Sequence, residues 1–271
     1  MYEYETYAVE KRPEQKTAIL YLNRPEKMNA MNWPFWRDLE LVVDELEKDP
    51  EVEAVVVAGK GRAFSVGIDI FGFASEFLET ISAATPANRE DFRRLILRMQ
   101  KGFSRMHGGD NVYIAAIHHY CLGGGLDLAA ACDIRLASRD AVISLREARV
   151  AIVADMGSLN RLPGIIGQGN ARLMAFTARD FTAAECLRMG LLSEIYETPE
   201  ALLEGALNLA AEITANARSA VRGSKRLLNF MENHSVEEGL DYVALWNSSF
   251  FSIQEVQEVA MKSAGRGKKA D

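Results

Sequence analysis

Cysteine and histidine are scarce in this sequence, and neither is arranged as a set of metal ligands. The three cysteines, Cys121, Cys132 and Cys186, form no Cys-x-x-Cys pair, and the four histidines show no ligand spacing relative to them. A disulfide scaffold and a structural zinc site are therefore disfavoured. His118 and His119 end an apolar run, where we expect packing at the end of a strand rather than metal binding.

Long apolar runs and an excess of positive charge are also missing. No segment approaches the ~20 apolar residues that a membrane span requires. The N-terminus is acidic where a signal or transit peptide would be basic, so we expect a cytoplasmic protein with reduced thiols. Lys and Arg number 31 against 38 Asp and Glu, a net charge of -7. We therefore expect neither a nucleic acid nor a membrane as partner.

Buried strands and helices alternate along the first two thirds of the chain. Continuous apolar runs predict strands at 17–22, 54–58, 112–117, 134–137 and 142–145. Helical spacing of apolar residues predicts helices from Pro34 to Lys48 and from Asn88 to His107. The segment from Phe71 to Pro86 lacks clean periodicity and is interpreted as a surface loop or a flap over a substrate. Strands without hairpin turns, separated by helices, indicate an α/β fold with a mainly parallel sheet.

Strand signals end near residue 200, and helical patterns follow. They cover 201–216, 220–231 and 236–262, and the lysine-bearing tail 265–271 reads as a frayed, solvated end. We therefore divide the chain into a core, residues 1–199, and a C-terminal helical subdomain, residues 200–271. A chain of 271 residues is long enough for a pocket-bearing core of this size.

Two glycine-containing turns each follow a buried strand. They are Ala-Phe-Ser-Val-Gly-Ile-Asp-Ile at 63–70 and Cys-Leu-Gly-Gly-Gly-Leu-Asp-Leu at 121–128. Glycine lets the backbone approach a ligand closely, and N–H groups at the start of a following helix can point at developing negative charge. Side by side, the two turns would form an oxyanion hole from main chain alone. Each could equally do no more than turn the chain.

Three carboxylic acids follow in apolar surroundings. Asp127 lies between leucines, Glu147 comes just after a predicted strand, and Asp155 lies in the stretch Val-Ala-Ile-Val-Ala-Asp-Met-Gly at 150–157. Acids are seldom buried unless they are paired or functional, and grouping like charges raises the pKa of at least one. One acid could then hold a proton while another accepts one. The alternative is a set of separate ion pairs with Arg135, Arg146, Arg149 and Arg161.

Ordered motifs over nearly the whole chain resemble the signatures of the enoyl-CoA hydratase/isomerase (crotonase) superfamily. They are Arg-Pro-Glu-Lys-Met-Asn-Ala at 24–30 and the segments at 63–69, 123–135, 157–163 and 181–192. The resemblance implies an α/β, crotonase-like spiral of ββα units with a C-terminal helical oligomerisation subdomain that builds a homotrimer or homohexamer. It also implies an acyl-CoA thioester as substrate. Coenzyme A is then part of the substrate, and neither a separate cofactor nor a metal is implied.

Within the superfamily, the acids resemble those of the Δ3,5-Δ2,4-dienoyl-CoA isomerases. A typical hydratase has glutamates at the positions of Asp127 and Glu147 and Pro-x-x-Gly at 154–157, where this chain has Ala-Asp-Met-Gly. The segment 241–247 also resembles these isomerases. The resemblance implies conversion of 3,5-dienoyl-CoA to 2,4-dienoyl-CoA. Hydration of an enoyl-CoA or dienoyl-CoA is the alternative within the superfamily.

The same resemblance implies a role for each site residue. Glu147 would be the base at carbon 2 and Asp155 the acid at carbon 6, or the reverse, with Asp127 orienting or tuning them. The main-chain N–H groups of Ile68 and Gly124 would form the oxyanion hole. Contacts with substrate and CoA are expected at Lys27, Asn29, Ala30, Ser65, Val66, Gly67, Asp69 and Gly125.

Two other classes of protein share parts of these patterns. Residues 63–67 imitate the Gly-x-Ser-x-Gly elbow of a serine hydrolase, with Ser65 as nucleophile and alanine in place of the first glycine. No histidine stands where a base is expected, because His234 lies in a polar helical stretch. Some proteins of the crotonase fold bind RNA, and a net charge of -7 argues against such an adaptor.

Overall fold

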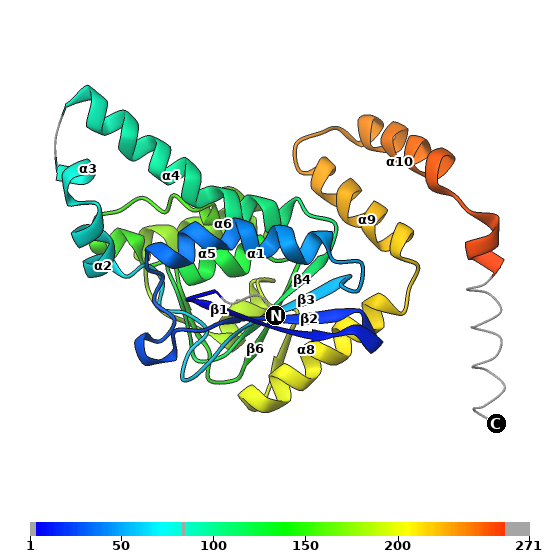
Figure 1. The fold of residues 1–271 in the computed structure, drawn as a ribbon, viewed down its shortest axis with the longest axis horizontal. Coiled ribbons are helices and arrows are strands. Elements are labelled where there is room, and N and C mark those ends of the chain that lie inside the picture. Colours follow the sequence, from blue (N-terminus) through cyan, green and yellow to red (C-terminus); the bar gives the residue numbers. More distant parts are fainter. Residues whose placement is uncertain (1–3, 83–84, 258–271) are drawn as a thin grey trace.

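The main sheet of the computed structural model, which describes residues 4–82 and 85–257, is mostly parallel. Its six strands lie in the order β1-β2-β3-β4-β6-β9 (Figure 1). Their bounds are β1 (Tyr7–Arg12), β2 (Thr17–Leu22), β3 (Ala54–Gly59), β4 (Val112–Ile117), β6 (Ile134–Ser138) and β9 (Glu194–Tyr196). β1 pairs antiparallel with β2, and every later pairing in this sheet is parallel. The predicted α/β class is confirmed.

A second, smaller sheet turns the chain into a spiral. It contains β5 (Tyr120–Leu122), β7 (Val142–Ser144) and β8 (Phe181–Thr182) in the order β5-β7-β8. β4 and β5 lead into helix α5 (Gly124–Ala131), and β6 and β7 lead into α6 (Ser158–Thr177). A strand of the large sheet, a strand of the small sheet and a helix therefore repeat, which confirms the spiral of ββα units.

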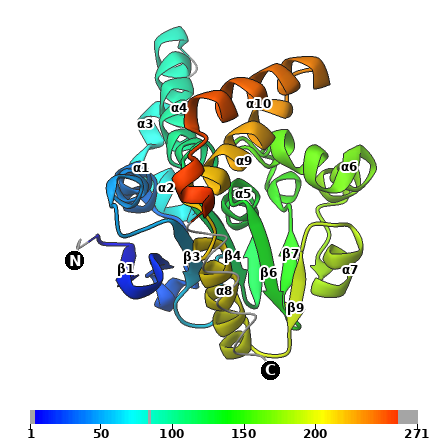
Figure 2. The same cartoon turned by 90° about the vertical axis from the view of Figure 1, so that its right-hand side faces the viewer.

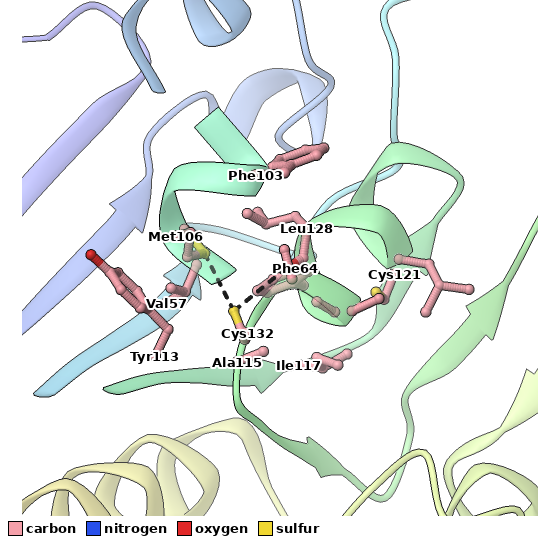
Figure 3. Packing of buried hydrophobic residues seen from close by; sticks show 14 of the residues in the cluster. Val57, Phe64, Phe103, Met106, Tyr113, Ala115, Ile117, Cys121, Leu128 and Cys132 are labelled. Carbon is pink, nitrogen blue, oxygen red and sulfur yellow. Dashed lines mark hydrogen bonds between the residues drawn. The ribbon is translucent and has the colours of Figure 1, made fainter. Parts of the chain in front are cut away.

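Helices cover both faces of the large sheet. On one face lie α1 (Trp33–Lys48), α4 (Pro86–His107) and α5, and on the other lies α8 (Pro199–Thr214) (Figure 1). Successive residues of β3 alternate between the two layers, because Val55 and Val57 join the first core and Ala54 and Val56 join the second. Burial on both faces explains the unbroken apolar run. Figure 3 shows the first core around Val57.

The segment before α4 is helical, so the prediction of a surface loop at 71–86 is wrong, and the alternative of a flap stays a prediction. Two short helices, α2 (Ile70–Glu76) and α3 (Leu78–Ser82), occupy most of it, and residues 83–84 lie outside the described residues. Asp69 caps α2 by accepting a hydrogen bond from the Gly72 N–H. Phe77 packs edge-on against Trp33 at 5.0 Å between ring centroids. Phe73 is the one buried residue of α2, and a single buried position gives no periodicity to detect.

Two helices of the C-terminal region form a hairpin that extends from the body of the molecule (Figures 1 and 2). They are α9 (Arg218–Met231) and α10 (Val236–Phe250), so the helix predicted at 236–262 is interrupted after Phe250. The remainder of that prediction beyond 257, and the tail 265–271, lie outside the described residues. Lys225 anchors α9 to the core through the Asp133 carboxylate at 2.9 Å and the Asn111 carbonyl at 2.7 Å. The division at residue 200 stays a prediction.

No helix in residues 4–82 and 85–257 combines the length and apolar character needed to cross a membrane.

Two further helices, α6 and α7 (Ala183–Arg188), were not predicted from the periodicity of apolar residues. In α6 the chain carries Pro163 and a non-helical Gly167, and these interruptions hide the helical pattern.

Candidate active site

The two glycine turns lie against each other at the ends of β3 and β5. A bridge between Ser65 and Cys121 joins the two segments. A Cβ placed on Gly67 would lie 2.6 Å from the Leu122 carbonyl oxygen and 3.1 Å from the Gly124 nitrogen. Gly67 also has a positive φ of 84°. A side chain at this position would therefore push the two turns apart.

Two main-chain N–H groups at this junction have no partner among the described residues. The Met31 N–H donates to the Gly67 carbonyl at 2.8 Å, and the Met31 carbonyl accepts from the Asp69 N–H at 3.0 Å. Because these two bonds flank Ile68, the Ile68 N–H points away from Met31. Within residues 4–82 and 85–257, neither the Ile68 N–H nor the Gly124 N–H has an acceptor. A Cβ on Gly124 would lie 3.7 Å from the Ile68 nitrogen. Two free donors this close together suit an oxyanion.

Asp127 is the deepest of the three acids. It lies on α5 with 1% of its surface exposed, and its carboxylate accepts the Ser158 N–H at the start of α6 at 2.6 Å. Burial raises the pKa of Asp127 to about 6, and the charge of Asp155 adds to the rise against the opposing Ser158 hydrogen bonds. Asp127 therefore ties α5 to the chain segment that follows Asp155.

Glu147 lies beside the second glycine turn. It starts a 3-10 turn (Glu147–Val150), and one carboxylate oxygen would be 3.1 Å from a Cβ on Gly123. The other oxygen is buried and has no hydrogen-bond partner among the described residues. Burial, together with the charges of Asp127 and Asp155, raises the pKa of Glu147 to about 7. A carboxyl of this kind can take or give a proton near neutral pH.

Asp155 completes the group. Burial raises the pKa of Asp155, and its charge acts on the carboxyls of both Asp127 and Glu147, which places the three acids together. None of the three has a salt bridge within the described part of the chain. Arg146 and Arg149 pair instead with Asp180. The alternative of three separate ion pairs with arginine is therefore wrong.

Several predicted substrate contacts brace the first glycine turn from within. Asn29 is 3% exposed, and its amide donates to the carbonyls of Lys60 and Ala63. The Ser65 hydroxyl is fully buried, donates to the Asn29 carbonyl at 2.8 Å and accepts from the Gly67 N–H at 3.1 Å. With its hydroxyl used in this way and no histidine bonded to it, Ser65 does not have the environment of a hydrolase nucleophile.

Asp69 is held by a residue to which the sequence patterns gave no role. Arg24 donates to the Asp69 carboxylate at 2.7 Å and to the Ala30 carbonyl at 3.0 Å. The hydrogen bond from Arg24 is the main reason that the pKa of Asp69 lies below its ordinary value. Lys27 is exposed nearby and lowers the same pKa. The signal for Arg24 was its place in the motif at 24–30.

The remaining predicted contacts are Val66 and Gly125. The Val66 N–H donates to the Met28 carbonyl at 3.2 Å. A Cβ on Gly125 would lie 2.9 Å from the Ser65 carbonyl oxygen, so this glycine allows α5 to approach the first turn. The described residues contain no group of histidine, cysteine and acidic side chains that could hold a metal ion.

Comparison with known proteins identifies the family. The sequence profile named enoyl-CoA hydratase/isomerase matches residues 13–268. The chain belongs to the enoyl-CoA hydratase/isomerase family. It is 42% identical to the mitochondrial Δ(3,5)-Δ(2,4)-dienoyl-CoA isomerase of Mus musculus over 87% of this chain and 72% of the mouse protein. To the peroxisomal Δ(3,5)-Δ(2,4)-dienoyl-CoA isomerase of Arabidopsis thaliana it is 36% identical, over 92% and 90% of the two chains.

A solved structure agrees with this family fold. The enoyl-CoA hydratase of Thermoplasma volcanium superposes with a TM-score of 0.81 at 29% identity, over 95% of this chain and 96% of the other. The crotonase-like fold expected from the sequence motifs is thus confirmed. The dienoyl-CoA isomerases are the more similar of these relatives in sequence.

Proposed function

We propose that this protein is an isomerase that converts 3,5-dienoyl-CoA thioesters to 2,4-dienoyl-CoA. The observation that carries the proposal is a group of three carboxyls, Asp127 buried and Glu147 and Asp155 partly buried, next to two main-chain N–H groups; among the described residues the carboxyls have no salt bridge and the N–H groups no acceptor. The similarity to dienoyl-CoA isomerases supports the same reaction. Hydration of an enoyl-CoA is the second candidate, supported by the likeness to a hydratase structure.

The reaction begins at the thioester carbonyl. Its oxygen would accept hydrogen bonds from the N–H groups of Ile68 and Gly124, which stabilise the negative charge of an enolate. Glu147 takes a proton from carbon 2, and the electrons delocalise along the diene as far as carbon 6. Asp155 gives a proton to carbon 6, and the double bonds then lie at the 2 and 4 positions. Proton transfer from Glu147 to Asp155 resets the site.

The distance between the two reacting carbons explains the need for two acids. Carbons 2 and 6 are separated by four bonds, so one carboxylate beside carbon 2 does not reach carbon 6. Glu147 lies against Gly123, next to the Gly124 donor, and this position supports a role at the carbonyl end. Asp155 then serves the far end. Asp127, which accepts the Ser158 N–H, orients the Asp155 segment and raises the pKa of Glu147.

The remaining parts of the proposal concern the CoA end and the assembly. The CoA portion would lie along Lys27 to Ala30 and Ser65 to Asp69, with main chain rather than the Asn29 and Ser65 side chains making the contacts. No cofactor besides the CoA of the substrate is required, because the thioester supplies the acidity of carbon 2. A homotrimer or homohexamer is proposed for the assembly. The cytoplasmic location stays a prediction, and the names of the two relatives place those proteins in the mitochondrion and the peroxisome.

One experiment distinguishes the two candidate functions. The purified protein is given 3,5-dienoyl-CoA and, separately, 2-enoyl-CoA, and thioester absorbance is followed for both. We expect rapid appearance of the conjugated 2,4-diene chromophore and negligible loss of the enoyl chromophore. Hydration of 2-enoyl-CoA without diene formation would overturn the proposal and establish the hydratase.

A further inference from the structure

We propose that Gln100 is a positioning residue that holds Asp155 at the distance needed for proton delivery. This inference rests on the proposed isomerase function, because it names the residue that supports one of the two proton-transfer groups. Gln100 is separated from Asp155 by 55 positions in the sequence, and it belongs to none of the family motifs described above.

The contact runs from a fixed helix to the main chain of the acid. The Gln100 side-chain amide donates to the Asp155 carbonyl oxygen at 2.5 Å. Gln100 lies on α4 between Met99, 3% exposed, and Phe103, fully buried, and both side chains belong to the central core. The core thus fixes the donor, and the hydrogen bond transmits that position to Asp155.

Two other side chains hold the same segment further along. Asp127, on α5, accepts the Ser158 N–H at 2.6 Å. The Arg161 guanidinium donates to the Met156 carbonyl at 3.4 Å. Side chains from α4, α5 and α6 therefore hold the main chain from Asp155 to Ser158. Gln100 is the member of this set that acts on the peptide of Asp155 itself.

The surroundings leave the segment dependent on these contacts. Val150, Ile152 and Val153 are 45%, 40% and 76% exposed, and among residues 150–154 only Ala154, which adjoins Asp155, is buried in the core. Behind it lies a groove of 1220 Å³ lined by Gln100, Met156, Gly157 and Arg161, among others. Without the Gln100 hydrogen bond, the segment has room to withdraw from the site. Misplacement of a reacting group by about 1 Å can cost about 10²-fold in rate.

The test uses Gln100→Met, which keeps the length of the side chain and removes the donor. We expect kcat for 3,5-dienoyl-CoA isomerisation to fall at least about tenfold. The rate at which carbon 2 exchanges its hydrogen with deuterated solvent should stay within about threefold of the unmutated protein, because Glu147 and the oxyanion hole are untouched. Gln168→Met is the matched control: Gln168 lines the same groove without a hydrogen bond to the segment, and its variant should change neither rate.

Two further measurements keep the inference open to refutation. Gln100→Asn retains the amide but shortens its reach, and we expect the same separation of exchange from isomerisation. Amide hydrogen exchange over residues 151–158 should accelerate in both Gln100 variants, a readout that needs no substrate. Wild-type rates, or equal loss of exchange and isomerisation, would overturn the role of Gln100. If the unmutated protein exchanges the hydrogen on carbon 2 but forms no diene, the isomerase function is refuted. In that case, unchanged amide hydrogen exchange in the Gln100 variants would still refute the role of Gln100.

Discussion

Carboxylic acids of this protein divide according to whether they have a cationic partner. The Arg24 guanidinium holds the pKa of Asp69 below its ordinary value. The Asp69 carboxylate pairs with Arg24 and caps α2 by accepting the Gly72 N–H. Asp127 and Glu147 have no salt bridge to any described residue, and burial is the main cause that raises their pKa values to about 6 and about 7. The paired acid contributes to structure, and the unpaired acids remain able to exchange protons near neutral pH.

The raised values predict a bell-shaped pH dependence of kcat/KM. Isomerisation needs one ionised and one protonated carboxyl in the group of three. Above pH about 7, the highest value in the group, the last proton shared by the three carboxyls is lost, no acid remains for carbon 6, and kcat/KM should fall about tenfold per pH unit. At low pH all three carboxyls are protonated, no base remains, and kcat/KM falls again. Because the acids interact, the two limbs belong to the group as a whole.

This pH dependence is checked by stopped-flow measurement of diene formation between pH 4 and pH 9. That range brackets the pKa values of about 6 for Asp127 and about 7 for Glu147. A rate that keeps rising through pH 8 would contradict the requirement for a protonated acid.

Substitution of the two outer acids separates their roles. Asp155→Asn should reduce isomerisation at least about 10²-fold and leave exchange at carbon 2, because the base is intact. Glu147→Gln should reduce both exchange and isomerisation. Glu197→Gln, an exposed acid paired with Arg139, should change neither. The measurement is solvent deuterium incorporation followed by mass spectrometry, and the opposite pattern would assign carbon 2 to Asp155.

Helices, strands and turns were predicted correctly where a local sequence pattern determines them. The strands 17–22 and 112–117 have the predicted bounds, because both are apolar runs buried on both faces. The helix predicted from Pro34 begins one residue earlier, capped by Asn32. The motifs also placed both glycine turns and all three acids in one region. Unbroken apolar runs and glycine turns are local signals, so one sequence suffices to find them.

Elements and contacts that depend on distant neighbours could not be predicted in this way. β1 lies at the edge of the sheet and has exposed residues, so its strand conformation depends on its pairing with β2. The hydrogen bond from Gln100 to Asp155 and the ion pair of Arg24 with Asp69 join residues 55 and 45 positions apart. No periodicity or spacing records such contacts. For the same reason, the bracing roles of Asn29 and Ser65 became visible only in the folded chain.

The whole molecule leaves apolar surface open on its C-terminal hairpin. Large apolar side chains of α9 and α10 are more than half exposed: Leu228 71%, Val236 70%, Leu240 64%, Leu245 61% and Phe250 56%. Apolar patches of this extent mark interaction surfaces in soluble proteins. Lys225 holds α9 against the core, so the hairpin presents this surface in a defined orientation. A second copy of the chain is the partner that the oligomerisation proposal calls for.

This surface predicts the behaviour of the protein in solution. Light scattering coupled to size exclusion should give three or six times the chain mass of 30.0 kDa, as expected for closed symmetry. Leu240→Glu combined with Leu245→Glu places two charges on the apolar face of α10 and should reduce the mass to that of a single chain. Leu41→Glu, on α1 and 53% exposed, adds a charge elsewhere and should leave the assembly intact. A single-chain mass for the unmutated protein would refute the proposal, and an unchanged mass for the double variant would show that other surfaces hold the copies together.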